Sequence, residues 1–229
     1  MSRIVLLTQP ECVEAATYRL AAAQAEIVVA LTRADLDAAI ARGTSDLRLI
    51  SFGSPVIVPQ EILSALPGPA YNVHPGPPEY PGLFPSVYAL YDGAKSFAAT
   101  LHEMVAEIDA GPIVSVNRFP IPEDCDRGRL DMLTFNEMLR IVQRFAAHLV
   151  DPSTALPSYD GRWSGPRRTR ADFNAMCALP EDASREEFIR RLRAVGEGPN
   201  HALTITRFGR NFHLASDVRP VTRGGQPTD

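Results

Sequence analysis

The chain has 229 residues, of which 45% are hydrophobic and 22% are charged, proportions typical of a globular protein with a buried core. Its net charge of −4 is unevenly placed: residues 1–160 carry 19 acidic and 11 basic side chains, whereas residues 161–229 carry 12 basic and 8 acidic ones. This distribution argues against nucleic-acid binding by the larger part of the chain and leaves a phosphate contact by the tail open.

No apolar run approaches the roughly 18 residues that a membrane-spanning helix needs. The three cysteines, Cys12, Cys125 and Cys177, are far apart, and their spacing suggests neither a disulfide framework nor a zinc site. We therefore expect a cytoplasmic protein with reduced thiols and no bound metal.

The first part of the chain alternates short apolar runs with helical patterns. Predicted strands cover residues 3–8, 26–31, 47–52 and 70–74, and the segments between them predict helices over 11–24, 34–42 and 60–66. Strands that alternate with helices in this way indicate a parallel sheet with crossover helices.

A proline-rich loop over residues 74–85 follows, and the chain then continues to a long amphipathic helix. The pattern predicts a short helix over 86–91, strands over 96–104 and 113–120, and the long helix over 128–150. We assign residues 1–150 to one catalytic domain.

After residue 150 the composition changes. Residues 151–170 are rich in Pro, Ser and Arg and resemble a connector, and residues 171–229 form a small appendage. Within it we predict a helix over 184–195, with Ser184 and Glu187 in a capping box, and a hairpin over 202–216 around Gly209. Because a helix and a hairpin cannot fold alone, they should pack on the main domain.

Several catalytic motifs are absent from the sequence. There is no phosphate-binding loop of the G-x-x-x-x-G-K-[ST] type, no G-x-S-x-G elbow and no H-E-x-x-H helix. The first strand-to-helix turn, residues 8–11, contains no glycine, so no dinucleotide cradle is expected there.

The candidate chemistry lies between residues 72 and 112. Asn72 and His74 alternate at the end of a predicted strand, so they share one face at the carboxyl edge of the sheet, where open α/β folds bind ligands. Asp109 follows a later strand. An amide, an imidazole and a carboxylate can together catalyse the attack of an amine on a carbonyl group. A strand-end histidine and a turn aspartate are also common structural residues, so spacing alone leaves both interpretations open.

Two segments carry a resemblance: NVHPGPPEYPG at residues 72–82 and TLHEMVAEIDAGPIV at residues 100–114. Together they resemble the folate-dependent formyltransferases, which include glycinamide ribonucleotide transformylase, methionyl-tRNA formyltransferase and the sugar N-formyltransferases. The resemblance covers residues 47–120. It implies a shortened Rossmann-like formyltransferase domain of α/β class with a mostly parallel sheet, and Asn72, His74 and Asp109 as the catalytic residues.

The resemblance also implies a binding pocket and a substrate-side loop. Gly82 would close that loop, and Thr100 and His102 would face the site, although a buried, hydrogen-bonded structural role accounts for His102 equally well. The residues implied in the folate pocket are Val56, Ile57, Val58, Val105, Ala106, Glu107 and Ile108.

The implied reaction transfers a formyl group from 10-formyltetrahydrofolate to the primary amine of a small acceptor, for which a nucleotide-linked amino sugar is our preferred interpretation. Asn72 and protonated His74 would stabilise the oxyanion, and Asp109 would raise the pKa of His74 and relay a proton. Arg167, Arg168 and Arg170 either contact acceptor phosphates or form a solvated basic connector.

The sequence departs from the family pattern in three places. Asn72 comes early, which suggests that one βα unit is missing or short. The turn at residues 8–11 lacks the phosphate loop of the ribonucleotide enzyme, and residues 76–79 read Gly-Pro-Pro-Glu where the family has Leu-Leu-Pro. Glycinamide ribonucleotide is therefore disfavoured as the acceptor.

Three alternatives to the preferred activity remain. A formyltetrahydrofolate hydrolase would use water as the acceptor, but such proteins carry a regulatory domain that is not seen here. A methionyl-tRNA formyltransferase needs a tRNA-binding barrel longer than the tail after residue 161. A non-catalytic folate-binding module would not need the three candidate residues. A homodimer is left open.

Overall fold

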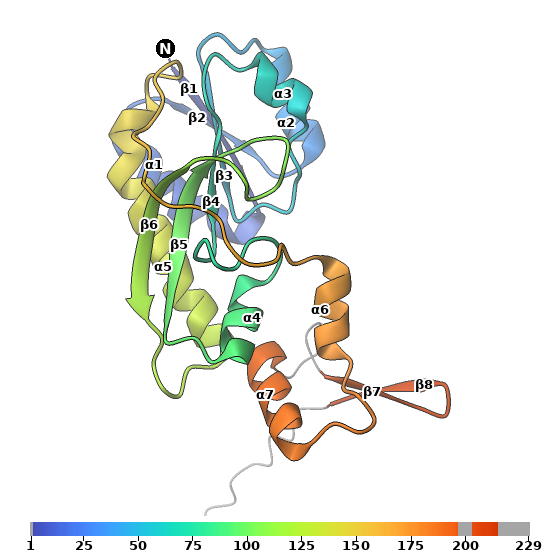
Figure 1. Ribbon diagram of the computed structural model, residues 1–229. Coiled ribbons are helices and arrows are strands. Elements are labelled where there is room, and N and C mark those ends of the chain that lie inside the picture. Colours follow the sequence, from blue (N-terminus) through green and yellow to red (C-terminus); the bar gives the residue numbers. More distant parts are fainter. Residues whose placement is uncertain (1, 197–202, 215–229) are drawn as a thin grey trace, which may run out of the picture.

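A computed structural model describes residues 2–196 and 203–214, and its centre is a six-stranded sheet (Figure 1). The first four strands are mutually parallel, and β5 runs antiparallel to both β4 and β6. In the order β2-β1-β3-β4-β5-β6, the strands are β2 (Glu26–Ala30), β1 (Arg3–Thr8), β3 (Leu47–Phe52), β4 (Tyr71–His74), β5 (Ser96–Glu103) and β6 (Ile113–Pro120). The predicted α/β class with a mostly parallel sheet is confirmed.

Side chains alternate between the two faces of the sheet along each strand, and helices cover both faces. In β1, Ile4 and Leu6 pack in the core cluster formed with α1 (Val13–Leu20) and α5 (Arg127–Phe145), whereas Val5 and Leu7 pack in the cluster formed with α2 (Arg33–Ala41) and α3 (Gln60–Ala65). The sheet is therefore a central layer between helices, which leaves its strand ends for ligands (Figure 1).

The C-terminal helix packs on the main domain, as predicted, whereas the strands of the hairpin are largely exposed and contact residues 178 and 179 instead. A third cluster joins α4 (Pro85–Asp92) and the start of α5 to α6 (Arg170–Cys177) and α7 (Arg185–Val195), with Ala194 and Val195 fully buried. Arg190 donates to the Tyr91 carbonyl oxygen, which ties α7 to α4. The strands β7 (Thr204–Arg207) and β8 (Arg210–His213) form the predicted hairpin, while residues 202, 215 and 216 of that prediction lie outside the described residues.

Some local predictions need correction. The helix predicted over 128–150 ends at Phe145 and continues as one 3-10 turn, Ala146–Leu149. Ser184 caps α7 by accepting from the Glu187 N–H, but no capping box forms, because the Glu187 carboxylate accepts from Arg191 and Tyr91 instead. Helix α6, which has a capping box of its own, was not predicted. The unit boundaries at 150 and 170 stay a prediction.

The segment predicted as a connector is held firmly to the sheet. Arg48, 1% exposed, donates to the Pro69, Asp151 and Thr154 carbonyl oxygens, and its guanidinium lies over the Tyr71 ring. The Tyr71 hydroxyl in turn accepts from the Leu156 N–H at 2.7 Å. These contacts fix residues 151–156, which follow the 3-10 turn.

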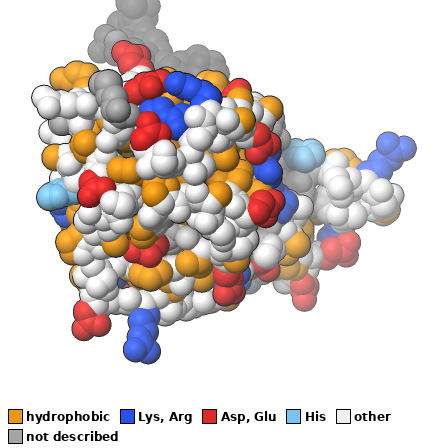
Figure 2. All heavy atoms as spheres, turned by 90° about the horizontal axis from the view of Figure 1, so that it is seen from above, with side chains coloured by type: hydrophobic (Ala, Val, Ile, Leu, Met, Phe, Trp, Pro, Cys, Tyr) orange, Lys and Arg blue, Asp and Glu red, His pale blue; other side chains and the backbone are white. Residues whose placement is uncertain are grey.

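Surface features agree with the mixed charge of the sequence. On the face seen in Figure 2, acidic, basic and apolar side chains are interspersed, without a continuous basic surface among the described residues. None of the described helices is long and apolar enough to cross a membrane. Cys12, Cys125 and Cys177 are free thiols.

Candidate active site

The site forms where β4 ends and pairs with β5. Asn72 lies opposite His102 and His74 lies opposite Thr100 in the antiparallel register of the two strands. The same register explains why two histidines 28 positions apart in the sequence approach each other, since the strands run in opposite directions through the site. His74 and His102 are both 2% exposed, and Asn72 is half-buried.

Asp109 completes the cluster from the turn after β5. Its backbone is left-handed, with φ of 47°, a conformation that aspartate tolerates better than most residues. Its Oδ2 lies 3.2 Å from His74 Nδ1, and its Oδ1 lies 3.3 Å from His102 Nε2. The structure thus brings Asn72, His74 and Asp109 together at one edge of the sheet, with the carboxylate between two imidazoles.

His102 links Asp109 to Asn72. Its Nε2 lies 3.1 Å from Asn72 Nδ2 as well as near Asp109, and its Nδ1 lies 2.8 Å from the Glu103 carbonyl oxygen, to which it donates. A chain of hydrogen-bonding groups therefore runs from the half-buried Asn72 through His102 and Asp109 to His74. The imidazole and carboxylate members of this chain can take up and release a proton, whereas the Asn72 amide can only form hydrogen bonds.

Burial sets the protonation of the cluster. Burial tends to raise the pKa of the Asp109 carboxyl, but His74, His102 and the Gly82 N–H outweigh this effect and bring the pKa to about 2. Burial lowers the pKa of His74 below its ordinary value, and Asp109 offsets only part of that. Asp109 does raise the pKa of His74, as expected, but burial lowers it by more, so the net shift favours the neutral imidazole and not the cationic one that was expected.

The proline-rich loop is held against the carboxylate by Gly82. The Gly82 N–H donates to Asp109 Oδ2 at 2.8 Å, and its φ of 91° and the Arg168 carbonyl oxygen, 2.3 Å from where a Cβ would lie, both require glycine. Thr100 Oγ1 donates to the Gly76 carbonyl oxygen at 2.7 Å, and His74 Nε2 lies 3.0 Å from the Tyr80 carbonyl oxygen. Gly82 thus contacts Asp109 in the cluster, and Thr100 contacts the proline-rich loop.

The segments predicted to bind folate border the same region. Val56 and Val58, which follow β3, pack against the same core cluster as Met104, which directly precedes the second segment. Three of the predicted side chains remain exposed despite being apolar: Ile57 at 62%, Val105 at 41% and Ile108 at 46%. Among the described residues, no backbone carbonyl accepts from the N–H groups of residues 105–108. Exposed apolar side chains beside unpaired N–H groups suit a flat heteroaromatic ring.

Sequence reasoning missed Trp163, which contacts the cluster from the predicted connector. Its indole meets the His74 and His102 rings edge-on, with ring centroids 5.5 and 4.9 Å away. Trp163 is the only tryptophan in the sequence and stands in a segment otherwise rich in Ser, Pro and Arg. An isolated tryptophan in such a segment was the feature of the sequence that could have pointed to its place in the site.

The three arginines predicted as phosphate contacts differ in their partners. Arg167 forms an ion pair with Glu107 at 2.6 Å, whereas Arg168 and Arg170 form no ion pair within 4 Å among the described residues. Arg168 lies over the Tyr88 ring at 4.5 Å and Arg170 over the Phe84 ring at 4.7 Å. Both guanidinium groups are therefore held in place with their donors available.

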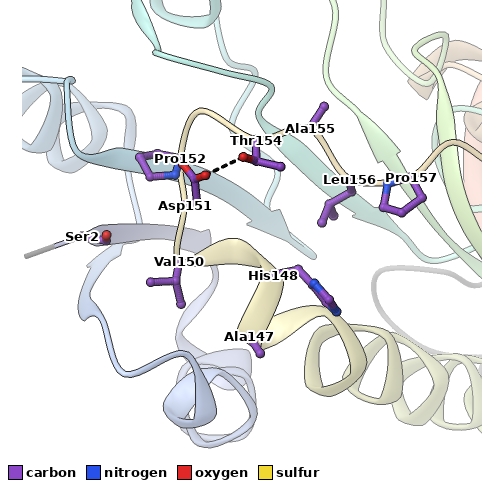
Figure 3. A pocket seen from close by; sticks show the side chains of 10 residues that line it. All are labelled: Ser2, Ala147, His148, Val150, Asp151, Pro152, Thr154, Ala155, Leu156 and Pro157. Carbon is purple, nitrogen blue, oxygen red and sulfur yellow. Dashed lines mark hydrogen bonds between the residues drawn. The ribbon is translucent and has the colours of Figure 1, made fainter.

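A separate cavity of about 680 Å³ lies near the start of β1 (Figure 3). It is lined by Ser2 and by residues between Ala147 and Pro157, and Asp151 bonds to Thr154 beside it. It is distinct from the cluster around Asp109, which forms at the carboxyl end of β4. Among the described residues, no group of three or more His, Cys, Asp or Glu side chains is arranged to hold a metal ion.

Comparison with known proteins gives concordant results. A family model described as formyl transferase matches residues 10–137, more than half of the chain. A methionyl-tRNA formyltransferase of Listeria monocytogenes is 33% identical over 100 residues, which are 43% of this chain and 31% of the relative. The chain thus spans about a third of that relative's length.

Two solved structures share the fold over most of their length. A sugar N-formyltransferase from Shewanella sp. FDAARGOS_354 has a TM-score of 0.75 at 20% identity, covering 94% of this chain and 97% of that one. An N-formyltransferase from Helicobacter canadensis, solved with folinic acid and dTDP-3-aminofucose, has a TM-score of 0.64 at 16% identity, covering 85% and 80%.

Proposed function

The chain belongs to the formyl transferase family, and we propose that it transfers a formyl group from 10-formyltetrahydrofolate to the primary amine of a nucleotide-linked amino sugar. The observation that carries this proposal is the Asp109 carboxylate, 3.2 and 3.3 Å from two buried imidazoles at the carboxyl end of β4. The half-buried Asn72 amide beside them provides a neutral donor for an oxyanion.

The choice of acceptor is supported by chain-wide similarity and by the arginines. The likeness to the Shewanella sugar N-formyltransferase covers nearly all of both chains, whereas the tRNA-dependent relative is matched over 31% of its length. The Helicobacter protein was solved with a nucleotide-linked amino sugar. Arg168 and Arg170 supply guanidinium groups for phosphates beside the Gly82 loop, since the Gly82 backbone pairs with that of Arg168.

The folate is expected to lie against Ile57, Val105 and Ile108, with its ring edge hydrogen-bonded to the backbone N–H groups of residues 105–108. When bound, it would supply the formyl group, and its leaving nitrogen would take up the proton that the amine loses. The Helicobacter protein was solved with folinic acid, which supports a folate as the formyl donor.

The residues of the cluster divide the remaining work. Asn72 donates its amide N–H to the oxyanion that forms when the amine attacks the formyl carbon. Neutral His74, whose pKa is lowered by burial, accepts the proton that the amine loses. Asp109, ionised because its pKa is about 2, then stabilises the imidazolium until His74 passes the proton on to the leaving nitrogen of the folate, and His102 holds the carboxylate and the Asn72 amide in place.

The test uses the full chain, 10-formyltetrahydrofolate and a panel of acceptors. Formation of tetrahydrofolate only with a nucleotide-linked amino sugar, together with a formylated sugar product in mass spectrometry, is the expected result. Formate release without any amine would identify a hydrolase, and formylation of methionyl-tRNA would identify the tRNA enzyme. Tight folate binding with no turnover on any acceptor would indicate a binding module and refute the proposal.

A further inference from the structure

The segment predicted as a connector passes directly over the catalytic cluster. We call residues 159–168 the strap. Its backbone is bonded to both loops that carry site residues: the Tyr159 N–H donates to the Ile113 carbonyl oxygen, the Ser164 N–H to that of Pro78, and the Arg168 N–H to that of Pro81. The strap therefore joins the proline-rich loop to the start of β6, one on each side of Asp109.

Trp163 is the strap residue that reaches the histidines. Its ring lies at 80° to the His74 ring and at 86° to the His102 ring, so that one indole meets both imidazoles edge-on. Its Nε1–H donates to the Gly111 carbonyl oxygen at 2.8 Å. Gly111 has no room for a side chain, because a Cβ would lie 2.1 Å from the Glu103 carbonyl oxygen.

From these contacts we propose that Trp163 is a positioning residue, which holds the His74 and His102 rings in register with the Asp109 carboxylate and keeps water away from it. Its role in turnover rests on the proposed function, whereas its contact with the two imidazoles does not. The indole acts through the histidines and makes no bond with Asp109.

The geometry shows what the indole would prevent. The two nitrogens of His74 face Asp109 Oδ2 and the Tyr80 carbonyl oxygen, and those of His102 face Asp109 Oδ1 and the Glu103 carbonyl oxygen. A rotation of either ring would break two of these contacts at once. The Asp109 side chain is only 4% exposed, although a carboxylate is strongly hydrated in water, so its neighbours exclude solvent effectively.

Three variants separate positioning from simple stability. Trp163→Ala removes the indole, Trp163→Phe keeps an aromatic ring but loses the N–H bond to Gly111, and Arg162→Ala is the control on an exposed neighbour in the strap. We expect Trp163→Ala to lower kcat by about 10- to 100-fold, the effect of a misplaced catalytic group, with a smaller change in KM. Trp163→Phe should recover most of this loss, and Arg162→Ala should resemble the wild type.

Histidine side-chain NMR gives a measurement that needs no substrate. The titratable groups that interact with His74 are Asp109 and His102, and both are retained in all three variants. In Trp163→Ala, admission of water should raise the His74 pKa towards its ordinary value, and the ring resonances of both histidines should shift. Unchanged titration curves and unchanged kcat would overturn the proposal.

The wild-type chain provides a second measurement, which holds even where Trp163→Ala does not fold. Because Trp163 is the only tryptophan, indole fluorescence reports on its surroundings, and protonated imidazole quenches indole emission. The emission should titrate with pH, and His74→Asn and His102→Asn should each change the curve. Emission that is independent of His74 and His102 would refute the contact even in an enzyme with the proposed activity.

Discussion

Replacing Asp109 with asparagine tests the centre of the site with almost no change in shape. The wild-type carboxylate accepts from the Gly82 N–H at 2.8 Å and faces His74 Nδ1 at 3.2 Å and His102 Nε2 at 3.3 Å. Asparagine can supply one oxygen acceptor and one NH₂ donor. Whichever way the amide is turned, its NH₂ group replaces a carboxylate oxygen. That oxygen had either accepted from the Gly82 N–H and attracted His74, or attracted His102.

The size of the effect follows from the charge. The pKa of Asp109 is about 2 against 3.8 for an unperturbed aspartate, so the folded state favours the ionised form by roughly 2 kcal/mol. Its depressed pKa contributes stability that is present above about pH 4 and is lost as the pH falls towards 2. Because part of this preference comes from the charge on His74, which is lost near pH 7, Asp109→Asn should lower the free energy of unfolding at pH 7 by less than about 2 kcal/mol, or Tm by less than roughly 8 °C. Loss of proton transfer should lower kcat about 10²- to 10⁴-fold.

The matched control is Asp151→Asn. Asp151 also has a pKa of about 2, because its carboxylate accepts from Ser153 and Thr154, but it lies at the separate cavity near the start of β1. Steady-state kinetics of tetrahydrofolate release and thermal unfolding should show the loss in Asp109→Asn and near wild-type kcat in Asp151→Asn. A kcat in Asp109→Asn within a few fold of the wild type, in a folded protein, would refute the proton-transfer role.

Three further predictions concern Gly82, His74 and Arg48. Gly82→Ala should cost about 1–3 kcal/mol and lower kcat, because its Cβ would overlap the Arg168 carbonyl oxygen; urea unfolding and kinetics check this, and a wild-type profile would contradict it. Since burial lowers the pKa of His74, the folded state binds fewer protons than the unfolded state just below pH 6.5. Stability should therefore fall as the pH drops below 6.5, and it should fall less steeply in His74→Asn. Urea unfolding across this pH range measures both slopes, and equal slopes would contradict the prediction. Arg48→Met should cost about 3 kcal/mol, because three backbone carbonyls lose their buried donor; an unchanged urea midpoint would show that the anchor is dispensable.

The sequence by itself determined the sheet and the catalytic candidates. The bounds predicted for residues 3–8, 47–52 and 113–120 are those of β1, β3 and β6, because each is a short, strongly apolar or alternating run whose conformation depends on local pattern. The two motifs grouped Asn72, His74 and Asp109 through the family resemblance, because β5 is antiparallel to β4 and strand direction alone would not bring the turn at Asp109 to His74. Their roles stay a prediction.

Only the tertiary structure decided what surrounds these residues. The strap, the contact of Trp163 with two histidines and the half-burial of Asn72 all depend on contacts between distant segments, to which local patterns are blind. The direction of the His74 pKa is the clearest case. The sequence shows a carboxylate near an imidazole, which would raise the pKa, but burial by β5, the proline-rich loop and the strap removes the hydration that a charged ring needs and lowers it.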